Sequence, residues 1–215
     1  MPLAQREIVW TIVVAGGSGE RFGGPKQYEK LGPLRVLDHS MAAANEASDG
    51  VVLVVPPVDA EREGGVAGGT TRCGSVRAGL EAVPEEATIV CVHDAARPFA
   101  THAAFVAVVT AVAGGADGAV PGLPISDTVK RVDEGRRVIE TLPRASLFAA
   151  QTPQAFRASV LREAHRDGGE ATDDAALVEA VGGTVVVVDG DATNRKITCP
   201  DDLAWARSRI AEELR

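Results

Sequence analysis

The sequence lacks the features on which membrane, secreted and nucleic-acid-binding proteins depend. It contains no run of about 18 uncharged apolar residues, so it predicts no membrane span. Its start, Met1–Glu7, has no basic segment, apolar run or cleavage site of a secretory signal, and we expect a cytoplasmic location. A formal net charge of -8 disfavours the broad basic surface that binds nucleic acid, so any anionic ligand must be held locally.

Cysteine and lysine are both scarce. The three cysteines, Cys73, Cys91 and Cys199, lie far apart, which indicates neither a disulfide framework nor a paired-cysteine zinc site. We expect them to be reduced packing residues. A lysine ammonium on its flexible stem can follow a moving phosphate, although a chance bias towards arginine explains the scarcity equally well. The four lysines among the 22 basic residues are Lys26, Lys30, Lys130 and Lys196.

Short β-branched runs alternate with segments of helical spacing along the chain. This alternation predicts an α/β fold with a mostly parallel sheet, helices on both faces and one domain over residues 1–215. We interpret Pro56–Gly69 as a surface loop. The expected strands are Ile8–Val14, Val51–Val55, Thr88–Val92, Gly118–Val120 and Thr184–Val188. The expected helices are Val36–Ala47, Ser75–Ala82, Ala103–Val112, Ala158–His165, Asp173–Val181 and a last one from Pro200 to the C-terminus, with no second enzyme expected beyond it.

One segment departs from this alternation. Asp127–Val132 and Arg136–Leu142 have the pattern of two strands around the turn Asp133–Gly135. We interpret residues 126–150 or so as a projecting hairpin arm. Because a two-stranded ribbon is marginally stable alone, the arm should pack on a second subunit, and a homodimer is our hypothesis.

A glycine-rich stretch, Ala15–Gln27, directly follows the first expected strand. It places flexible backbone at the carboxyl end of a strand, where open α/β sheets bind ligands and glycine amides can approach phosphates closely. Arg21 and Lys26 add two positive charges. The Walker and dinucleotide patterns do not fit, because Lys26 is followed by Gln27 and Phe22 stands where the third glycine belongs. The alternative is an ordinary strand-to-helix turn.

The segment Val92–Pro98 follows another expected strand and should reach the same sheet edge. Asp94 is a candidate for holding a hydroxyl group or a metal-bound water. Alternatively, Asp94 caps the next turn and forms a structural ion pair with Arg97. We expect His93 to be a packing residue.

Two further segments should converge on this edge. Gly68–Ser75 precedes an expected helix, and small residues at a helix N-terminus suit base or phosphate contacts. Asn194–Thr198 follows the last expected strand and delivers Lys196. The sequence shows no Ser-His-Asp or Cys-His constellation for nucleophilic catalysis.

Seven motifs occur in a fixed order along nearly the whole chain. They are Ala15–Arg21 with Pro25–Gln27, Gly68–Val76, Val92–Pro98, Asp127-Thr128, Gln151–Phe156, Thr172–Asp174 and Asn194–Leu203. Together they resemble the 2-C-methyl-D-erythritol 4-phosphate cytidylyltransferases of the non-mevalonate isoprenoid pathway. The resemblance implies a Rossmann-like nucleotidyltransferase domain, an arm that contacts the partner of a homodimer, and CTP with a small polyol phosphate as substrates. It also implies Mg²⁺ or another divalent cation, held mainly by the CTP phosphates and water.

The resemblance implies roles for individual residues as well. Arg21 and Lys26 would stabilise charge on the phosphates, while Lys196 and, from across the dimer, Arg144 would position the methylerythritol phosphate. The implied nucleotide-binding residues are Ala15, Gly16, Gly17, Gly69, Thr70, Arg72, Ser75, Asp94 and Ala95. The implied substrate-binding residues are Asp94, Arg97, Thr128, Arg144, Thr152, Thr172 and Lys196. The chain departs from the family pattern at Val14, in a shortened approach to Pro25, and in a short Val58–Gly68 segment.

Three other readings remain open. A cytidylyltransferase acting on ribitol 5-phosphate shares most of these motifs, because nucleotide and chemistry are the same. A nucleotidyltransferase for another base, such as one building a molybdenum cofactor dinucleotide, does not account for Gln151–Gln154 or the arm. A catalytically silent nucleotide-binding protein is disfavoured by the presence of every charged residue named above.

Overall fold

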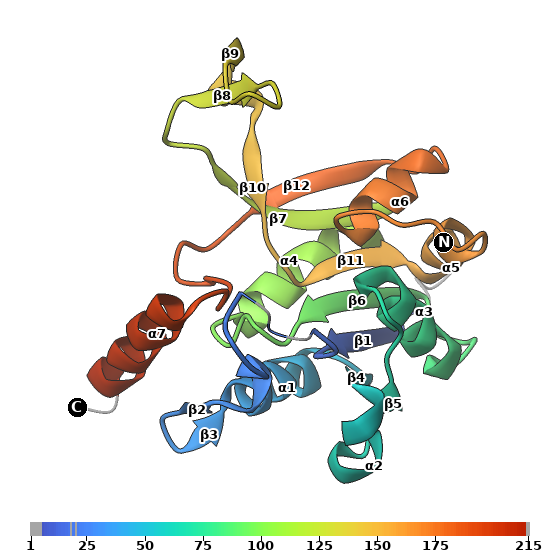
Figure 1. The fold of residues 1–215 in the computed structure, drawn as a ribbon. Helices are drawn as coiled ribbons and strands as arrows, with labels where there is room; N and C mark the ends of the chain where they lie inside the picture. The colour runs from blue at the N-terminus through green and yellow to red at the C-terminus, as the bar shows by residue number, and fades with distance from the viewer. Residues whose placement is uncertain (1–5, 18, 20, 214–215) are drawn as a thin grey trace.

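The computed structural model describes residues 6–17, 19 and 21–213. A twisted central sheet with helices on both sides confirms the predicted α/β class (Figure 1). In spatial order, the sheet contains β5 (Val66–Ala67), β4 (Gly50–Val55), β1 (Val9–Val14), β6 (Ile89–Asp94), β11 (Gln154–Arg157), β7 (Gly118–Pro124) and β12 (Val185–Asp189). β10 (Phe148–Ala150) pairs with the end of β7, along the same side as β11.

The sheet is mostly parallel, as predicted. β1 runs parallel to both β4 and β6, and β12 runs parallel to β7. The exceptions are β11, which lies antiparallel between β6 and β7, and β10, which pairs antiparallel with the end of β7. Parallel strands send their carboxyl ends to a common edge, so the segments that follow β1 and β6 emerge side by side.

Two apolar layers cover the sheet because successive side chains of each strand point to opposite faces. Ile12 packs with α3 (Arg72–Ala82), α5 (Ala158–His165) and α6 (Asp174–Ala180), whereas Val13 packs with α1 (Val36–Ala47) and α4 (His102–Ala113). The bounds of α1 and α5 match the predicted helices.

The last helix, α7 (Pro200–Glu213), begins at the predicted proline. Leu203 and Ala206 on α7 pack with Leu31 in a small third cluster beside the short strands β2 (Lys30–Leu31) and β3 (Leu34–Arg35). The predicted extension to the C-terminus includes residues 214–215, which lie outside the described residues. No helix within the described residues has both the length and the apolar character that a bilayer span requires.

The prediction of a plain surface loop over Pro56–Gly69 was wrong. This segment contains a 3-10 turn, Pro57–Asp59, the helix α2 (Ala60–Glu63) and strand β5. Gly64 ends α2 with a φ of 63°, a left-handed conformation that glycine adopts without steric cost. The chain then joins the edge of the sheet, so tertiary pairing rather than local composition decides its structure.

The predicted hairpin is present. β8 (Val129–Val132) and β9 (Val138–Leu142) pair antiparallel and project from the body of the molecule (Figure 1). Its apolar side chains lie largely in solvent, with Val138 59% and Ile139 62% exposed. That a second subunit covers this arm stays a prediction.

Candidate active site

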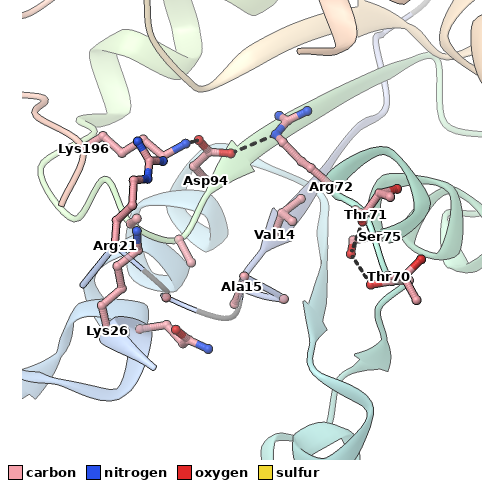
Figure 2. Close-up of a pocket in the computed structure, with 17 residues that line it drawn as sticks. Val14, Ala15, Arg21, Lys26, Thr70, Thr71, Arg72, Ser75, Asp94 and Lys196 are labelled. Atoms are coloured by element: carbon pink, nitrogen blue, oxygen red, sulfur yellow. Dashed lines mark hydrogen bonds and ion pairs between the residues drawn. The ribbon is translucent and has the colours of Figure 1, made fainter. Parts of the chain in front are cut away.

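A cavity of about 660 Å³ opens where β1 and β6 end (Figure 2). This volume lies within the range typical of small-ligand sites. The cavity brings together the four segments that the sequence predicts at one sheet edge, namely Ala15–Gln27, Gly68–Ser75, Val92–Pro98 and Asn194–Thr198. Of the predicted residues, those lining it are Ala15, Gly16, Gly17, Arg21, Lys26, Gly69, Thr70, Arg72, Ser75, Asp94, Ala95 and Lys196.

The glycine-rich loop folds back on itself directly after β1. The Gly19 carbonyl accepts hydrogen bonds of 2.8 Å from the amides of Phe22 and Gly23. Gly19 has a φ of 71°, and a Cβ there would lie 1.8 Å from the Gly24 carbonyl oxygen, so only glycine fits. Ser18 and Glu20, which belong to the predicted motif, lie outside the described residues.

Three cationic side chains, Arg21, Lys26 and Lys196, lie along one wall of the cavity (Figure 2). Burial lowers the pKa of the half-buried Lys26 ammonium, and the charges of Lys196 and Arg21 lower it further. Lys26 forms no ion pair with any residue that the structure describes. Like charges held this close together, with one of them unpaired, favour an anionic ligand.

Asp94, at the end of β6, is the acidic side chain that pairs with two cations of the cavity, Lys196 and Arg72. Its carboxylate accepts a 2.6 Å hydrogen bond from Lys196 Nζ and a 3.3 Å bond from Arg72 Nε. Burial alone would raise the pKa of Asp94, but the charges of Lys196 and Arg72 outweigh it and hold the pKa well below its usual range. The predicted turn forms through a 3.0 Å bond from the Arg97 amide to the Asp94 carbonyl, yet the carboxylate pairs with Lys196 and Arg72 instead of Arg97.

The opposite wall is built around the N-terminus of α3. Thr71 Oγ1 caps this helix by accepting a 2.9 Å bond from the Gly74 amide, so α3 begins at Arg72, three residues earlier than predicted. Ser75 Oγ donates to the Thr71 carbonyl at 2.9 Å. A Cβ on Gly16 would lie 3.2 Å from that hydroxyl oxygen, so the two loops approach each other across the cavity floor.

Five predicted substrate-binding residues do not line this cavity. Arg97 is tied down by a 2.8 Å bond from Nη1 to the Asn194 carbonyl, and Thr152 Oγ1 accepts a 3.0 Å bond from the Asp94 amide. Both therefore support the loops that carry Lys196 and Asp94. The other three, Thr128, Arg144 and Thr172, are exposed. Arg144 donates to the Ser126 carbonyl at the base of the arm.

His93 takes the packing position that the sequence predicts. It is fully buried, its ring lies 5.4 Å from the ring of Phe105, and Nδ1 hydrogen-bonds with Thr152 Oγ1 at 3.1 Å. Burial lowers its pKa to about 4, so the imidazole is neutral near pH 7. The three cysteines are free thiols.

Comparison with known proteins places this geometry in one family. The family model described as IspD: 2-C-methyl-D-erythritol 4-phosphate cytidylyltransferase matches residues 9–212. The chain belongs to this family. A 2-C-methyl-D-erythritol 4-phosphate cytidylyltransferase of Rubrobacter xylanophilus is 41% identical over 95% of this chain and 95% of its own length. The crystal structure of a 2-C-methyl-D-erythritol 4-phosphate cytidylyltransferase from Thermus thermophilus has a TM-score of 0.80 and 36% identity, covering 96% of this chain and all of that one.

Longer relatives are also similar. A bifunctional enzyme IspD/IspF of Anaeromyxobacter dehalogenans is 47% identical over 95% of this chain. The chain spans 57% to 59% of the length of three such bifunctional relatives. Family membership rests on the family model and on the Rubrobacter xylanophilus relative, which this chain covers over 95% of its length.

The side chains available as metal ligands limit how this protein could hold a metal ion. The described residues contain no group of three or more histidine, cysteine or acidic side chains that could bind one. Asp94 is the one acidic side chain described in the cavity lining. Mg²⁺ typically combines one or two carboxylates with substrate phosphates and water, so this site fits a cation that a triphosphate brings with it.

Proposed function

We propose that this protein transfers CMP from CTP to 2-C-methyl-D-erythritol 4-phosphate, releasing pyrophosphate and 4-diphosphocytidyl-2-C-methyl-D-erythritol. The observation that carries the proposal is the meeting of Arg21, Lys26 and Lys196 over a glycine-rich loop, in a chain of the cytidylyltransferase family. Two anionic substrates repel each other, and cations gathered at the meeting point lower that barrier.

The reaction requires positioning and charge neutralisation. A phosphate oxygen of the acceptor attacks the α-phosphorus of CTP in line, a new P–O bond forms, and the bond to pyrophosphate breaks. The attacking oxygen is already anionic, so no general base is needed, and neutral His93 stays in the core. Lys26 and Arg21 are suited to neutralise charge that develops on the leaving phosphates. Mg²⁺, when bound, would supply further neutralisation of the triphosphate, with Asp94 the residue available to it.

Lys196 is suited to the acceptor. Its ammonium is bonded to Asp94 Oδ2 and its side chain is 38% exposed, so it is fixed at one point while two N–H groups remain for a phosphate. This arrangement holds the acceptor phosphate next to the cations that bind the triphosphate. We propose this division of roles for the loop and for Lys196.

Measurement of pyrophosphate release tests the proposal. With CTP and Mg²⁺, turnover should require 2-C-methyl-D-erythritol 4-phosphate. Faster turnover with ribitol 5-phosphate would assign the chain to that acceptor instead. CTP binding without pyrophosphate release for either acceptor would favour a silent nucleotide-binding protein.

We also propose that two copies of the chain form a homodimer through the arm, residues 126–150. Arg144 lies exposed near the arm base and does not line the cavity of its own chain, so it is available to a partner's cavity. The exposed apolar side chains Val138, Ile139 and Phe148 would be covered by the same contact.

A mixing experiment tests the exchange across the dimer. Lys26→Met and Arg144→Ala proteins should each be at least about 100-fold slower than the wild type, whereas a mixed dimer contains one cavity with both residues. Random exchange of subunits should restore about a quarter of wild-type activity, because about half of the dimers are mixed and each has one complete site. No recovery, despite subunit exchange seen by native mass spectrometry, would contradict the role of Arg144 in the partner's cavity.

A further inference from the structure

A series of hydrogen-bonded polar side chains leads from the cavity into the core, to Asp174 at the start of α6 and His165 at the end of α5. Lys196 bonds Asp94, and Asp94 bonds Arg72 Nε at 3.3 Å. Arg72 Nη1 then donates to Asp174 Oδ2 at 2.7 Å, and Asp174 Oδ1 bonds His165 Nε2 at 3.0 Å. The reaction described above uses the cavity end of this series and leaves Asp174 and His165 without a role.

Asp174 is an unusual residue for the interior. Its side chain is fully buried, and His165 behind it is only 4% exposed. A buried carboxylate destabilises the fold unless it is paired and fully hydrogen-bonded, and an apolar residue would be more stable there in many proteins. Here both oxygens are bonded, and the shorter bond goes to Arg72. The buried charge is therefore directed at the guanidinium.

We propose that Asp174, held by His165, is a positioning residue that fixes the Arg72 guanidinium at the cavity wall so that it can bind the nucleotide. The inference rests on the proposed function. Asp94 and Asp174 take Nε and Nη1, and Nη2 has no hydrogen-bond partner among the described residues, so it can donate to an oxygen of CTP. Without Asp174, the guanidinium would be drawn to Asp94 alone and would compete there with Lys196.

Asp174, rather than Thr172, is the member of the Thr172–Asp174 motif that contacts a residue of the cavity lining. Thr172 is exposed, and Asp173 caps α6 by accepting a 3.1 Å bond from the Ala176 amide. Asp174, the next residue, turns inward and meets Arg72, which is 102 positions earlier in the chain. The motif thus acts on the cavity through Asp174.

A double-mutant cycle on CTP binding tests the proposal. Asp174→Asn keeps the volume but removes the charge, and it should weaken CTP binding, measured by calorimetry, about 10- to 100-fold. Because the effect passes through Arg72, the double variant Arg72→Gln/Asp174→Asn should bind CTP no more weakly than Arg72→Gln alone. A KM for CTP that rises more than kcat falls should accompany this result, and Asp174→Glu should recover part of the affinity.

His165→Phe provides a second variant in which the carboxylate is retained. It removes the donor behind Asp174 and should weaken CTP binding severalfold, again only while Arg72 is present. Glu63→Gln is the matched control. Its carboxylate is also largely buried, 6% exposed, and bonds Arg35 at 2.9 Å, but it lies outside the cavity, so CTP binding should be unchanged.

Two outcomes would overturn the inference, and they can be told apart. Losses that add in the double variant, in a protein that binds CTP, would show that Asp174 does not act through Arg72. A wild-type protein that binds no CTP would overturn the proposed function and the inference together. Wild-type pyrophosphate release, measured in parallel, reports on the proposed function alone.

Discussion

Replacing Lys26 with methionine should slow the reaction and at the same time stabilise the free protein. Burial and the charges of Lys196 and Arg21 lower the pKa of Lys26, so the folded state disfavours its charged form. This cost is fully present below the folded pKa and disappears as the pH rises towards the usual lysine value of about 10.4. At pH 7 the methionine removes the cost, and Tm should rise.

The expected loss of rate follows from the same geometry. A unit charge about 4 Å from a phosphate charge, at an effective dielectric of about 20, contributes about 4 kcal/mol. Removing one preorganised donor from a site of this kind typically costs about 2.7–4 kcal/mol, which corresponds to a loss of about 100- to 1000-fold. Because Lys26 has no ion pair among the described residues, its removal strands no carboxylate and adds no such penalty.

The assay combines kcat/KM from pyrophosphate release with Tm from thermal unfolding at pH 7. Lys30→Met is the matched control, since Lys30 is exposed and does not line the cavity, and its rate should equal that of the wild type. Near-wild-type turnover of Lys26→Met would refute the role of this charge. A slow variant with a lowered Tm would refute the electrostatic argument, because the loss would then reflect the fold.

Three further predictions concern the surrounding residues. Asp94→Asn should lower Tm. A carboxylate with a depressed pKa stabilises the fold above its usual pKa and loses that effect on acidification, so the Tm difference from wild type should be largest above about pH 5 and shrink below about pH 4. A Tm difference that does not change with pH would contradict this. Gly19→Ala places a Cβ 1.8 Å from the Gly24 carbonyl oxygen and should weaken CTP binding, measured by calorimetry, about tenfold or more. The control is Gly23→Ala, which has nothing within 4 Å of its Cβ and should weaken CTP binding less, through the left-handed backbone alone. The ring nitrogens of His93, whose pKa is about 4, should show no NMR titration between about pH 5 and 8, and a midpoint near 6.5 would exclude the buried neutral ring.

Much of the cavity could be predicted because its parts follow recognisable strands. The β-branched runs of β1 and β6 are typical of buried parallel strands, and the loops that follow parallel strands lie at one edge of the sheet. The positions of Arg21, Lys26 and Asp94 after these runs therefore predict a common site, and all three line the cavity.

Other features depend on contacts that no local pattern reveals. β11 comprises Gln154–Arg157, a short mixed segment that becomes a strand because β6 and β7 pair with it on both sides. Asp173 and Asp174 look alike in sequence as helix-capping residues. Only the approach of α3 to α6 distinguishes the cap from the residue that holds Arg72.

The most direct test of the proposed activity is the phosphorus chemistry of a single turnover, followed by ³¹P NMR with CTP, 2-C-methyl-D-erythritol 4-phosphate and Mg²⁺. The proposed function predicts that the CTP signals are replaced by pyrophosphate and, in equal amount, by the two coupled doublets of an unsymmetrical diphosphate. Such a diphosphate forms only when the acceptor phosphate attacks the α-phosphorus. Unchanged CTP, or pyrophosphate accompanied by free CMP, would contradict it.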